Sequence, residues 1–395
     1  MRFPAILPTM LIATLLTAGP ALATVTCGGP LPDFIAKMKK EALEKGHRKD
    51  TVDAFFANAR LDANVIKADR QQGIFRMSFI DFSRRVISRY RLDQGHRYAR
   101  ELDSLFDSIE RKYGVSRGVL LAFWALETDF GQVQGDFNTL NALITLSHDC
   151  RRPSLFQPQV FAALELFERG DFDPVRSTGA WAGEIGMVQM LPGDILENGV
   201  DGDGDGHVRL KTSRADALTS AGRMLRGLGW RPNEPWLQEI IVPADLDWTR
   251  TGIDKSLSVA QWTKLGVKPR TGTLGPANMK ASVLLPMGRK GPAFLAYPNF
   301  HVFFEWNKSF VYVTSAAYFA TRLEGAPVYK AGTPEPMLSL KQMKALQTRL
   351  RKRGHNVGPI DGILGKLTRA AVQKEQVRLG MPADAWPTVE LLNRL

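Results

Sequence analysis

Hydrophobic positions recur at helical spacing through most of the first half of the chain. Between residues 30 and 112, apolar side chains alternate with charged ones at intervals of three and four, which predicts several amphipathic helices. Residues 119–126 are apolar at every position, so this helix is expected to be buried on all faces. Two further core helices are predicted over 139–146 and 160–167.

The pattern changes in the second half. Residues 231–300 are rich in proline and glycine and contain short β-leaning runs, which predict an insert with a few strands. Helix is expected again over about 309–323. The three prolines of 326–336 predict a linker, and residues 337–395 have the pattern of a compact helical module.

The length and the N-terminal end change this picture. A chain of 395 residues exceeds one ordinary core, so two or three domains are expected. Residues 1–23 are typical of a secretory signal peptide, with Arg2, a short apolar run and a small-x-small site at 21–23. The mature protein is therefore expected to begin near Thr24 and to be periplasmic. No later stretch is long and charge-free enough for a transmembrane segment.

The chain has only two cysteines, Cys27 and Cys150. In an oxidising compartment, one disulfide would tie the mature N-terminus to the helical body. Lipidation of Cys27 is the alternative, but residues 24–26 match poorly the small, leucine-containing sequence that lipidation prefers. A nucleophilic Cys150 is disfavoured, since His148 and Asp149 are its chain neighbours and triad partners usually come from distant segments.

The formal net charge of +12 favours anionic partners, such as nucleic acid, a membrane surface or an acidic wall polymer. General solubility is the simpler explanation of the charge by itself. The secreted location and the lack of a nucleic-acid-binding motif or of a basic run with interleaved aromatics argue against nucleic acid.

Glu127 is the candidate catalytic group. It ends the apolar helix one turn before Gly131, a residue that can terminate a helix. Burial among Phe123, Trp124 and Leu126 and the negative end of the helix dipole both disfavour the charged form. These effects raise the pKa of Glu127, as a general acid near neutral pH requires. The alternative is a helix-terminal glutamate that points into water.

Four short segments, in a consistent order between residues 31 and 325, carry a family resemblance. They are a helix ending in Glu-Thr-x-aromatic-Gly, a Gly-x-x-Gln segment, an aspartate–glycine loop and an Asn-x-Ser-x-x-Tyr segment. The matching residues are Glu127, Thr128, Phe130 and Gly131; Ala182, Gly183, Gly186, Gln189 and Pro192; 201–206; and Asn307, Ser309 and Tyr312. The chain resembles the membrane-bound lytic transglycosylase B family of murein-cleaving enzymes.

The resemblance implies a mainly α (α+β) fold. A goose-lysozyme-like helical catalytic core over 24–325 would contain an EF-hand-like loop at 201–216 and the β-containing insert at about 231–300. After the linker at 326–336, a C-terminal three-helix module over 337–395 resembles the small peptidoglycan-binding domain. The residues that carry this second resemblance are Leu346, Gln347, Gly354, 358–365, Thr368, Ala371 and Val372. The module would tether the enzyme to its polymer, and an appendage that no longer binds is the alternative.

The activity implied is cleavage of the β-1,4 bond between N-acetylmuramic acid and N-acetylglucosamine in peptidoglycan. Ordinary glycosidases use two carboxylates. Glu127 has no obvious mate, since Asp129 faces another direction on a helix. In the resembling family one glutamate first protonates the glycosidic oxygen and then accepts the proton of the sugar's C6 hydroxyl, which closes a 1,6-anhydro ring. No cofactor is needed for this catalysis.

The resemblance also assigns substrate-binding residues: Gln189, Met190, Trp306, Asn307 and Tyr312. Core packing is the alternative for Trp306 and Tyr312. Two other functions are kept as hypotheses, a non-catalytic peptidoglycan-binding or scaffolding protein and a hydrolytic muramidase. Other cell-wall enzymes are conceivable partners besides peptidoglycan.

The chain departs from the family pattern at several positions. Glu184 replaces a small residue, Ala180 a serine, Met190 a phenylalanine, Leu191 a methionine and Trp306 a tyrosine. If Glu184 points into the cleft, its charge would raise the pKa of Glu127 further. The alternative is a solvated loop position for Glu184.

The aspartate–glycine loop matches a calcium-binding pattern. Asp201, Asp203, Asp205 and Gly206 correspond to positions 1, 3, 5 and 6 of an EF-hand loop, and His207 would offer its backbone carbonyl. Position 12 is Thr212 instead of a bidentate glutamate, and Arg209 at position 9 opposes binding. The resemblance implies that Asp216 completes the site. Structural calcium is the expectation, and an acidic turn without a metal is the alternative.

Overall fold

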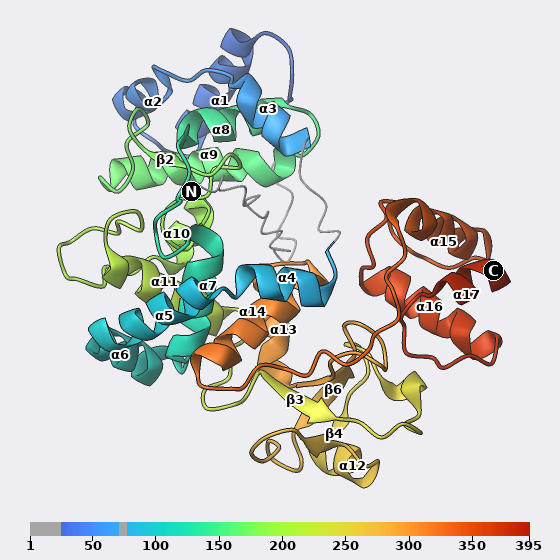
Figure 1. Ribbon diagram of the computed structural model, residues 1–395. Helices are drawn as coiled ribbons and strands as arrows, with labels where there is room; N and C mark the ends of the chain where they lie inside the picture. The colour runs from blue at the N-terminus through green and yellow to red at the C-terminus, as the bar shows by residue number, and fades with distance from the viewer. Residues whose placement is uncertain (1–24, 71–76) are drawn as a thin grey trace. The chain divides into compact units, whose positions relative to one another are not determined.

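The computed structural model describes residues 25–70 and 77–395 (Figure 1). The expected signal peptide, 1–23, lies outside the described residues. The chain forms two compact units that are both discontinuous in sequence. Of the described residues, the first unit contains 25–70, 103–113 and 123–227, and the second contains 77–102, 114–122 and 228–395.

The first unit is almost entirely helical. Its helices are α1 (Leu31–Glu44), α2 (Lys49–Phe56), α3 (Ala63–Arg70), α6 (Asp103–Tyr113), the second half of α7 (Arg117–Thr128), α8 (Thr139–His148), α9 (Pro153–Glu168), α10 (Pro192–Asn198) and α11 (Arg214–Gly227). One short antiparallel pair joins β1 (Phe137–Asn138) to β2 (Thr178–Gly179). In Figure 1 this unit carries the blue and green helices α1, α2, α3, α8 and α9.

The hydrophobic pattern explains which helices form the core of this unit. Residues 119–126 of α7 are all buried, as are residues 139–147 of α8, so neither run has a solvent-exposed face. In contrast, α1 buries Phe34, Met38 and Ala42 along one stripe, and it packs against α2. The side chain of Asn138 starts α8 by accepting a hydrogen bond from the N–H of Asn141 at 2.8 Å.

A disulfide between Cys27 and Cys150 holds the first described residues against the end of α8. The backbone adds a hydrogen bond from the N–H of Gly28 to the carbonyl of His148 at 2.9 Å. The amide of Gln157, on α9, donates to the carbonyl of Val25 at 2.7 Å. The N-terminal segment is therefore fixed by covalent and polar contacts.

The second unit combines helices with a five-stranded antiparallel sheet. Its helices are α4 (Phe79–Val86), α5 (Arg89–Glu101), the first half of α7, α12 (Val259–Lys264), α13 (Pro298–Trp306) and α14 (Phe310–Leu323), with one 3₁₀ turn at Trp248–Arg250. The strands are β3 (Leu237–Ile241), β4 (Leu257–Ser258), β5 (Lys268–Pro269), β6 (Lys280–Leu284) and β7 (Phe294–Ala296), in the order β4-β6-β7-β3-β5.

The sheet lies within the predicted insert, over a core centred on Trp262. This side chain is fully buried, and its indole N–H donates to the carbonyl of Ala281 at 2.7 Å, which satisfies its polar atom inside the core. Val283, Leu295 and Tyr297 pack into the same cluster. The insert thus has a hydrophobic core of its own.

The C-terminal module also belongs to the second unit. It consists of α15 (Leu340–Lys352), α16 (Lys366–Arg378) and α17 (Val389–Arg394) around Leu346, Leu350, Val372 and Leu391. A capping box between Ser339 and Gln342 begins α15. The predicted mainly helical fold with a small sheet and a C-terminal helical module is confirmed.

The segment 326–336 has no helix or strand but is packed at its centre. Tyr329 is buried, and its hydroxyl lies 2.9 Å from the hydroxyl of Ser83 on α4. The N–H of Lys330 donates to a carboxylate oxygen of Glu239 at 2.8 Å. The predicted linker therefore has defined contacts instead of running free.

The module also contacts the insert through polar side chains of α16. The guanidinium of Arg369 donates to the carbonyl of Pro286 at 2.7 Å and lies 4.6 Å from the ring of Phe310. The amide nitrogen of Gln373 lies 2.9 Å from the carbonyl oxygen of Trp248 and 3.1 Å from that of Thr251.

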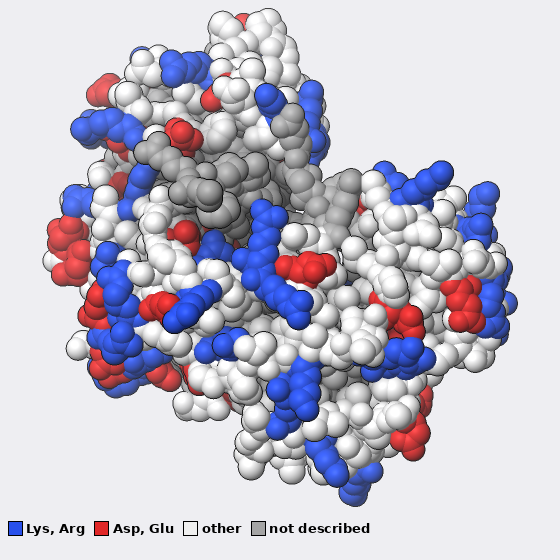
Figure 2. Space-filling view, in the orientation of Figure 1, with Lys and Arg blue, Asp and Glu red and all other residues white. Residues whose placement is uncertain are grey.

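Charge is distributed over the visible surface in mixed form. Figure 2 shows Lys and Arg side chains with Asp and Glu interspersed among them. None of the described helices has both the length and the apolar composition needed to cross a membrane.

Candidate active site

Helix α7 ends in a turn of left-handed backbone. Asp129, Phe130 and Gly131 have φ values of 51°, 59° and 84°, a region that residues other than glycine rarely adopt. The hydroxyl of Thr128 accepts a hydrogen bond from the N–H of Gly131 at 3.0 Å. Because such a conformation costs on the order of 1–3 kcal/mol per residue, the surrounding structure must hold it in place. Glu127, which is half-buried, lies on the last turn of the helix directly before these residues.

The end of α7 is joined to the loop that carries Gln189. The hydroxyl of Thr128 donates to the carbonyl of Met187 at 2.6 Å. Within the loop, the N–H of Ile185 donates to the carbonyl of Met190 at 2.8 Å, and the reverse bond measures 3.1 Å. The structure therefore brings together the segments of Glu127 and Gln189, which are distant in sequence.

Gln189 occupies a constrained position in this loop. Its φ is 53°, and its side chain is only 3% exposed. The amide nitrogen donates to the carbonyl of Gly186 at 2.7 Å and lies 3.3 Å from that of Gln134. Three of the five non-glycine residues with positive φ in the described part of the chain, Asp129, Phe130 and Gln189, lie in these two segments. Strain of this kind is typical of functional sites.

Glu184 lies in the same loop and is 1% exposed. The solvated-loop alternative is therefore wrong. Burial raises the pKa of Glu184 to about 8, against the opposing effect of the backbone N–H groups of Glu184 and Ala182. The negative charge of Glu127 acts in the same direction as burial, so the two carboxyl groups interact electrostatically. The Oε2 atom of Glu184 has no hydrogen-bond partner among the described residues.

The other predicted substrate-binding residues are all buried. Met190 has no exposed surface. In the second unit, Trp306 ends α13 and is fully buried, and Tyr312 on α14 is 5% exposed. Asn307 follows α13, and its side-chain oxygen accepts a hydrogen bond from the N–H of Ser309 at 2.9 Å. Their contact with a substrate stays a prediction.

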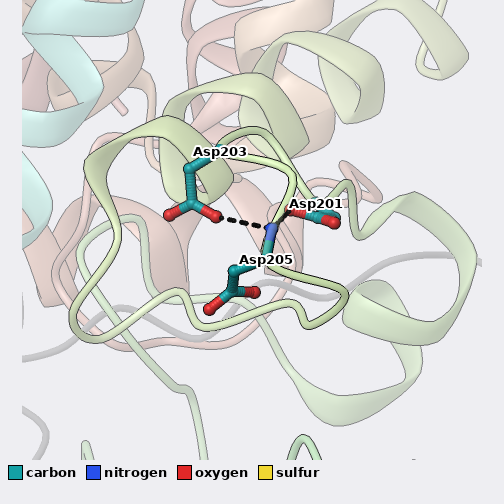
Figure 3. A group of neighbouring side chains, drawn as sticks. All are labelled: Asp201, Asp203 and Asp205. Atoms are coloured by element: carbon teal, nitrogen blue, oxygen red, sulfur yellow. Dashed lines mark hydrogen bonds between the residues drawn. The ribbon is translucent and has the colours of Figure 1, made fainter.

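Three predicted metal ligands converge in the aspartate loop (Figure 3). One carboxylate oxygen from each of Asp201, Asp203 and Asp205 lies within 4.8 Å of the other two, and all three side chains are exposed. Calcium binds oxygen ligands at about 2.3–2.6 Å, so two ligands on opposite sides of an ion are about 5 Å apart. The spacing and the hard oxygen donors both fit calcium.

Backbone N–H groups hold the aspartate side chains in this arrangement. Asp201 accepts hydrogen bonds from Gly204 at 2.6 Å, Asp205 at 3.1 Å and Gly206 at 2.8 Å. These bonds, above all the one from Gly206, lower the pKa of Asp201 against a smaller effect of desolvation. The side chain is therefore ionised at neutral pH, as a metal ligand must be.

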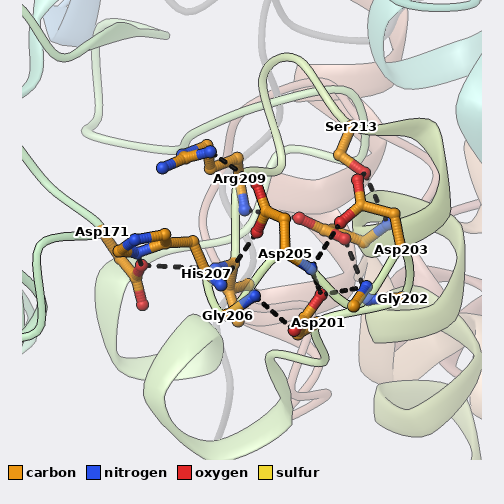
Figure 4. A network of polar contacts seen from close by, with 12 residues as sticks. Asp171, Asp201, Gly202, Asp203, Asp205, Gly206, His207, Arg209 and Ser213 are labelled. Carbon is orange, nitrogen blue, oxygen red and sulfur yellow. Dashed lines mark hydrogen bonds and ion pairs between the residues drawn. The ribbon is translucent and has the colours of Figure 1, made fainter.

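Asp216 and His207 are adjacent to this group, and their side chains bond to other partners than the three exposed aspartates. Fully buried Asp216 accepts hydrogen bonds from the N–H of Gly202 at 2.9 Å and of Arg209 at 2.7 Å, so its carboxylate ties the two halves of the loop together. The imidazole of His207 lies 2.8 Å from Asp171 (Figure 4). The structure thus places Asp216 as an anchor of the loop.

Arg209 and Ser213 bond to two of the exposed aspartates, as Figure 4 also shows. The guanidinium of Arg209 pairs with Asp205 at 2.5 Å, and the hydroxyl of Ser213 donates to Asp203 at 2.6 Å. A metal ion would have to compete with both. Sequence reasoning had identified Arg209 as an opposing charge, but it missed Asp171, which is 36 residues from His207 and carries no local signal.

Comparisons with known proteins identify the family. The transglycosylase SLT domain matches residues 31–321, and the putative peptidoglycan-binding domain matches residues 339–395. The membrane-bound lytic murein transglycosylase B of Escherichia coli (strain K12) is 23% identical over 277 residues, which are 70% of this chain and 74% of that protein. These matches confirm the resemblance predicted from the motifs.

Solved structures agree with this assignment. SltB3 from Pseudomonas aeruginosa, crystallised in complex with NAG-anhNAM-pentapeptide, is 31% identical with a TM-score of 0.85, covering 93% of this chain and 99% of that chain. The Escherichia coli lytic transglycosylase Slt35, solved in complex with calcium, shares the fold at 22% identity and a TM-score of 0.64, covering 76% of this chain and 96% of that chain. The chain therefore belongs to the transglycosylase SLT family of lytic transglycosylase enzymes and carries a C-terminal domain of the putative peptidoglycan-binding family.

Proposed function

We propose that the protein is a periplasmic lytic transglycosylase that cleaves the β-1,4 bond between N-acetylmuramic acid and N-acetylglucosamine in peptidoglycan and leaves 1,6-anhydromuramic ends. The observation that carries the proposal is the placement of Glu127. It lies on the last turn of a buried helix, before a strained turn bonded to the Gln189 loop. The related SltB3 was crystallised with a sugar containing an anhNAM unit, which supports the anhydro product.

In this mechanism Glu127 acts twice. Its carboxyl group donates a proton to the glycosidic oxygen as the bond from that oxygen to the anomeric carbon breaks. The C6 hydroxyl oxygen of the muramic acid then bonds to the anomeric carbon, and its proton passes to the Glu127 carboxylate. The acid is regenerated, and no water enters the product. Because the substrate supplies the nucleophile, one carboxylate suffices.

The state of Glu184 supports this mechanism over a two-carboxylate one. An ordinary glycosidase needs its second carboxylate ionised, as a base or a nucleophile. With burial raising its pKa to about 8, Glu184 keeps its proton at neutral pH and is unsuited to that role.

The five predicted substrate-binding residues are all buried, and they would act in different ways. The amide nitrogen of Gln189 is held by backbone carbonyls, so a sugar hydroxyl would bond to its amide oxygen. Asn307 and Tyr312 would contribute further contacts. Met190 and Trp306 have no exposed surface, so each would act by supporting the substrate-binding residue next to it in its own unit, Gln189 and Asn307 respectively.

Calcium would have a structural role. Asp201, Asp203, Asp205 and the backbone carbonyl of His207 would hold the ion, with Asp216 fixing the loop around it. Bound calcium would supply two positive charges that offset most of the negative charge of the three carboxylates.

The proposed organisation follows the chain. A signal peptide at 1–23 would direct export, and the disulfide supports an oxidising compartment. The catalytic domain at 24–325 would be followed by the linker at 326–336. The module at 337–395 would add a second contact with peptidoglycan and so raise the local substrate concentration.

The first prediction tests the acid. Glu127→Gln removes the transferable proton while keeping the shape, so cleavage of purified murein is expected to fall by about 10²–10⁴-fold. Mass spectrometry of the soluble products measures both the rate and the chemistry, and the wild-type protein is expected to release anhydro ends.

Binding of the variant to insoluble murein serves as the control and is expected to be retained. Undiminished cleavage by the variant would remove Glu127 from its role. Products one water heavier, with reducing ends, would assign the protein to the hydrolytic muramidases.

A further inference from the structure

We propose that Glu184 is a positioning residue for the candidate acid: a second, protonated carboxyl group that shares a proton with Glu127 and extends cleavage to more alkaline pH. This proposal rests on the proposed function of Glu127. It gives a role to Glu184, which stands where the resembling family has a small residue.

The backbone around Glu184 is held too tightly to release the side chain into solvent. The carbonyl of Glu184 accepts the N–H of Ala180 at 2.9 Å. A Cβ atom on Gly179 would lie 2.0 Å from this carbonyl oxygen, so the two strands of the loop are in direct contact. Further along, the hydroxyl of Thr128 fixes the carbonyl of Met187. The carboxyl group of Glu184 is therefore kept inside, on the loop bonded to the end of the acid-bearing helix.

The charged groups that act on Glu184 do not supply a positive charge that would pair with an ionised carboxylate at this position. Glu127 on α7 is a like charge, and Arg152, directly before α9, is an opposite one. The guanidinium of Arg152 pairs with the buried carboxylate of Asp69 on α3, which also pairs with Arg151 at 2.7 Å. Arg152 is thus committed to another carboxylate. An ionised Glu184 would be a buried charge with an unpartnered oxygen, a costly state that protonation avoids.

Because the charges of Glu127 and Glu184 act on each other, the two carboxyl groups titrate as a coupled pair. Ionising one makes it harder to ionise the other, so the last proton leaves the pair only at a raised pH. While one proton remains, it is distributed between Glu184 and Glu127, and a constant fraction of molecules carries it on Glu127. Only those molecules protonate the glycosidic oxygen. The proton that Glu127 donates returns from the C6 hydroxyl, so Glu184 ends each turnover unchanged.

The test compares pH profiles of kcat/KM for murein cleavage by the full-length wild-type protein and by Glu184→Gln. The glutamine copies the shape of the protonated acid but cannot retain a proton for the pair. Its profile is expected to lose the ionisation near pH 8, and its alkaline limb is expected to move to lower pH. In the acidic range, where both carboxyl groups are protonated, the two proteins are expected to differ by less than about threefold.

Asp194→Asn is the matched control. Asp194 is a half-buried acid, with a pKa raised to about 6 by desolvation, but it lies on α10, where it accepts the N–H of Leu191. Neutralising it is expected to leave the alkaline limb in place. Glu184→Asp, which keeps an ionisable group, is expected to recover part of the lost alkaline activity. A purely structural role for Glu184 would reduce kcat/KM equally at every pH.

A second readout does not depend on activity. At pH 7, the infrared difference spectrum between Glu127→Gln and the double variant Glu127→Gln, Glu184→Gln is expected to show the carbonyl band of a protonated carboxyl group. An alkaline limb unchanged in Glu184→Gln, or a missing band, would overturn the proposal. If Glu127→Gln stays fully active, the proposed function fails instead, and the band still reports whether Glu184 is protonated.

Discussion

At the residue scale, the buried carboxyl group of Glu184 makes the stability of the fold depend on pH. Its pKa is raised from 4.5 to about 8 by burial and by the charge of Glu127. The folded state therefore binds the proton more tightly than the unfolded state does. The contribution of this group is most favourable below pH 4.5 and is lost as the pH rises towards 8.

Glu184→Gln is expected to remove this dependence. The variant gains stability over the wild-type protein as the pH rises from 4.5 to 8, with an upper bound on the order of 5 kcal/mol at the alkaline end. Thermal unfolding at a series of pH values measures the difference. A variant that is no more stable than the wild-type protein at pH 8 would contradict the buried, uncompensated position of the side chain.

The sequence identified Glu127 but not the environment of its neighbour. The apolar run 119–126 and the following Gly131 were enough to place Glu127 at the end of a buried helix, because both signals are local. The burial of Glu184 depends on contacts between a loop and segments distant along the chain, so the sequence left two alternatives open. The complete burial of Trp306 has the same origin.

At the scale of elements, the aspartate loop contains five hydrogen bonds from backbone N–H groups to its own exposed carboxylates. The geometry is therefore largely formed by the chain itself, and an ion would add to it. The ion must displace the guanidinium of Arg209 from Asp205, which limits the affinity.

Calcium is expected to stabilise the protein through this loop. An ion at a concentration 100 times its Kd adds about 2.7 kcal/mol to the free energy of unfolding, so Tm should rise with calcium and fall with chelator. Asp203→Asn is expected to lose this response. Asp247→Asn, in the insert, removes an exposed aspartate that likewise bonds to a nearby N–H and should respond as the wild-type protein does. A calcium-independent Tm in the wild-type protein would exclude the site.

The hydrophobic pattern predicted the boundaries of some helices better than those of others. The predicted helix at 139–146 matches α8 closely, because Asn138 marks its start and residues 139–147 are all buried. In contrast, α9 begins at Pro153, seven residues before the predicted range, since its first two turns mix polar and apolar residues. The sheet order β4-β6-β7-β3-β5 is set by long-range pairing and could not be derived from the insert's composition.

At the scale of the molecule, the C-terminal module is attached through more than the linker. Gln373 is buried, and its amide nitrogen lies within hydrogen-bond distance of three backbone carbonyl oxygens, two in the insert and one in the module. Its amide oxygen accepts from Lys255. These bonds hold the module in one orientation relative to the insert. A module attached only by a flexible linker would have no fixed orientation.

Gln373→Ala is expected to loosen this attachment. The loss leaves buried carbonyl groups unsatisfied, at a cost of about 1–3 kcal/mol. Limited proteolysis is expected to cut the variant faster within 326–336, while binding to murein is retained.

Gln347→Ala is the matched control, because Gln347 is equally buried but bonds only within the module, to Asp361, Gly362, Ile363 and Thr368. This variant is expected to lose murein binding through damage to the module. Unchanged proteolysis of Gln373→Ala would show that the contact with the insert does not hold the module in place.

The division into units was beyond sequence reasoning. Residues 77–102 and 114–122 belong to the second unit, and helix α7 contributes to both units. Such a division arises when segments far apart in the chain pack together, and hydrophobic periodicity reports the buried face of a helix but not its partner.

The left-handed residues Asp129, Phe130 and Gln189 have a consequence for protein engineering. Glycine adopts this backbone without steric penalty, so replacing Asp129 by glycine relieves strain in the folded chain, whereas Phe130 is buried against Trp124 and its replacement would lose that packing. Glycine at position 129 also gives the backbone at the end of α7 more conformational freedom. Selection for heat resistance would then favour glycine at a strained position, and selection for turnover would favour the native residue. A library of variants scored for both properties would therefore mark the catalytic segment without a substrate-bound structure.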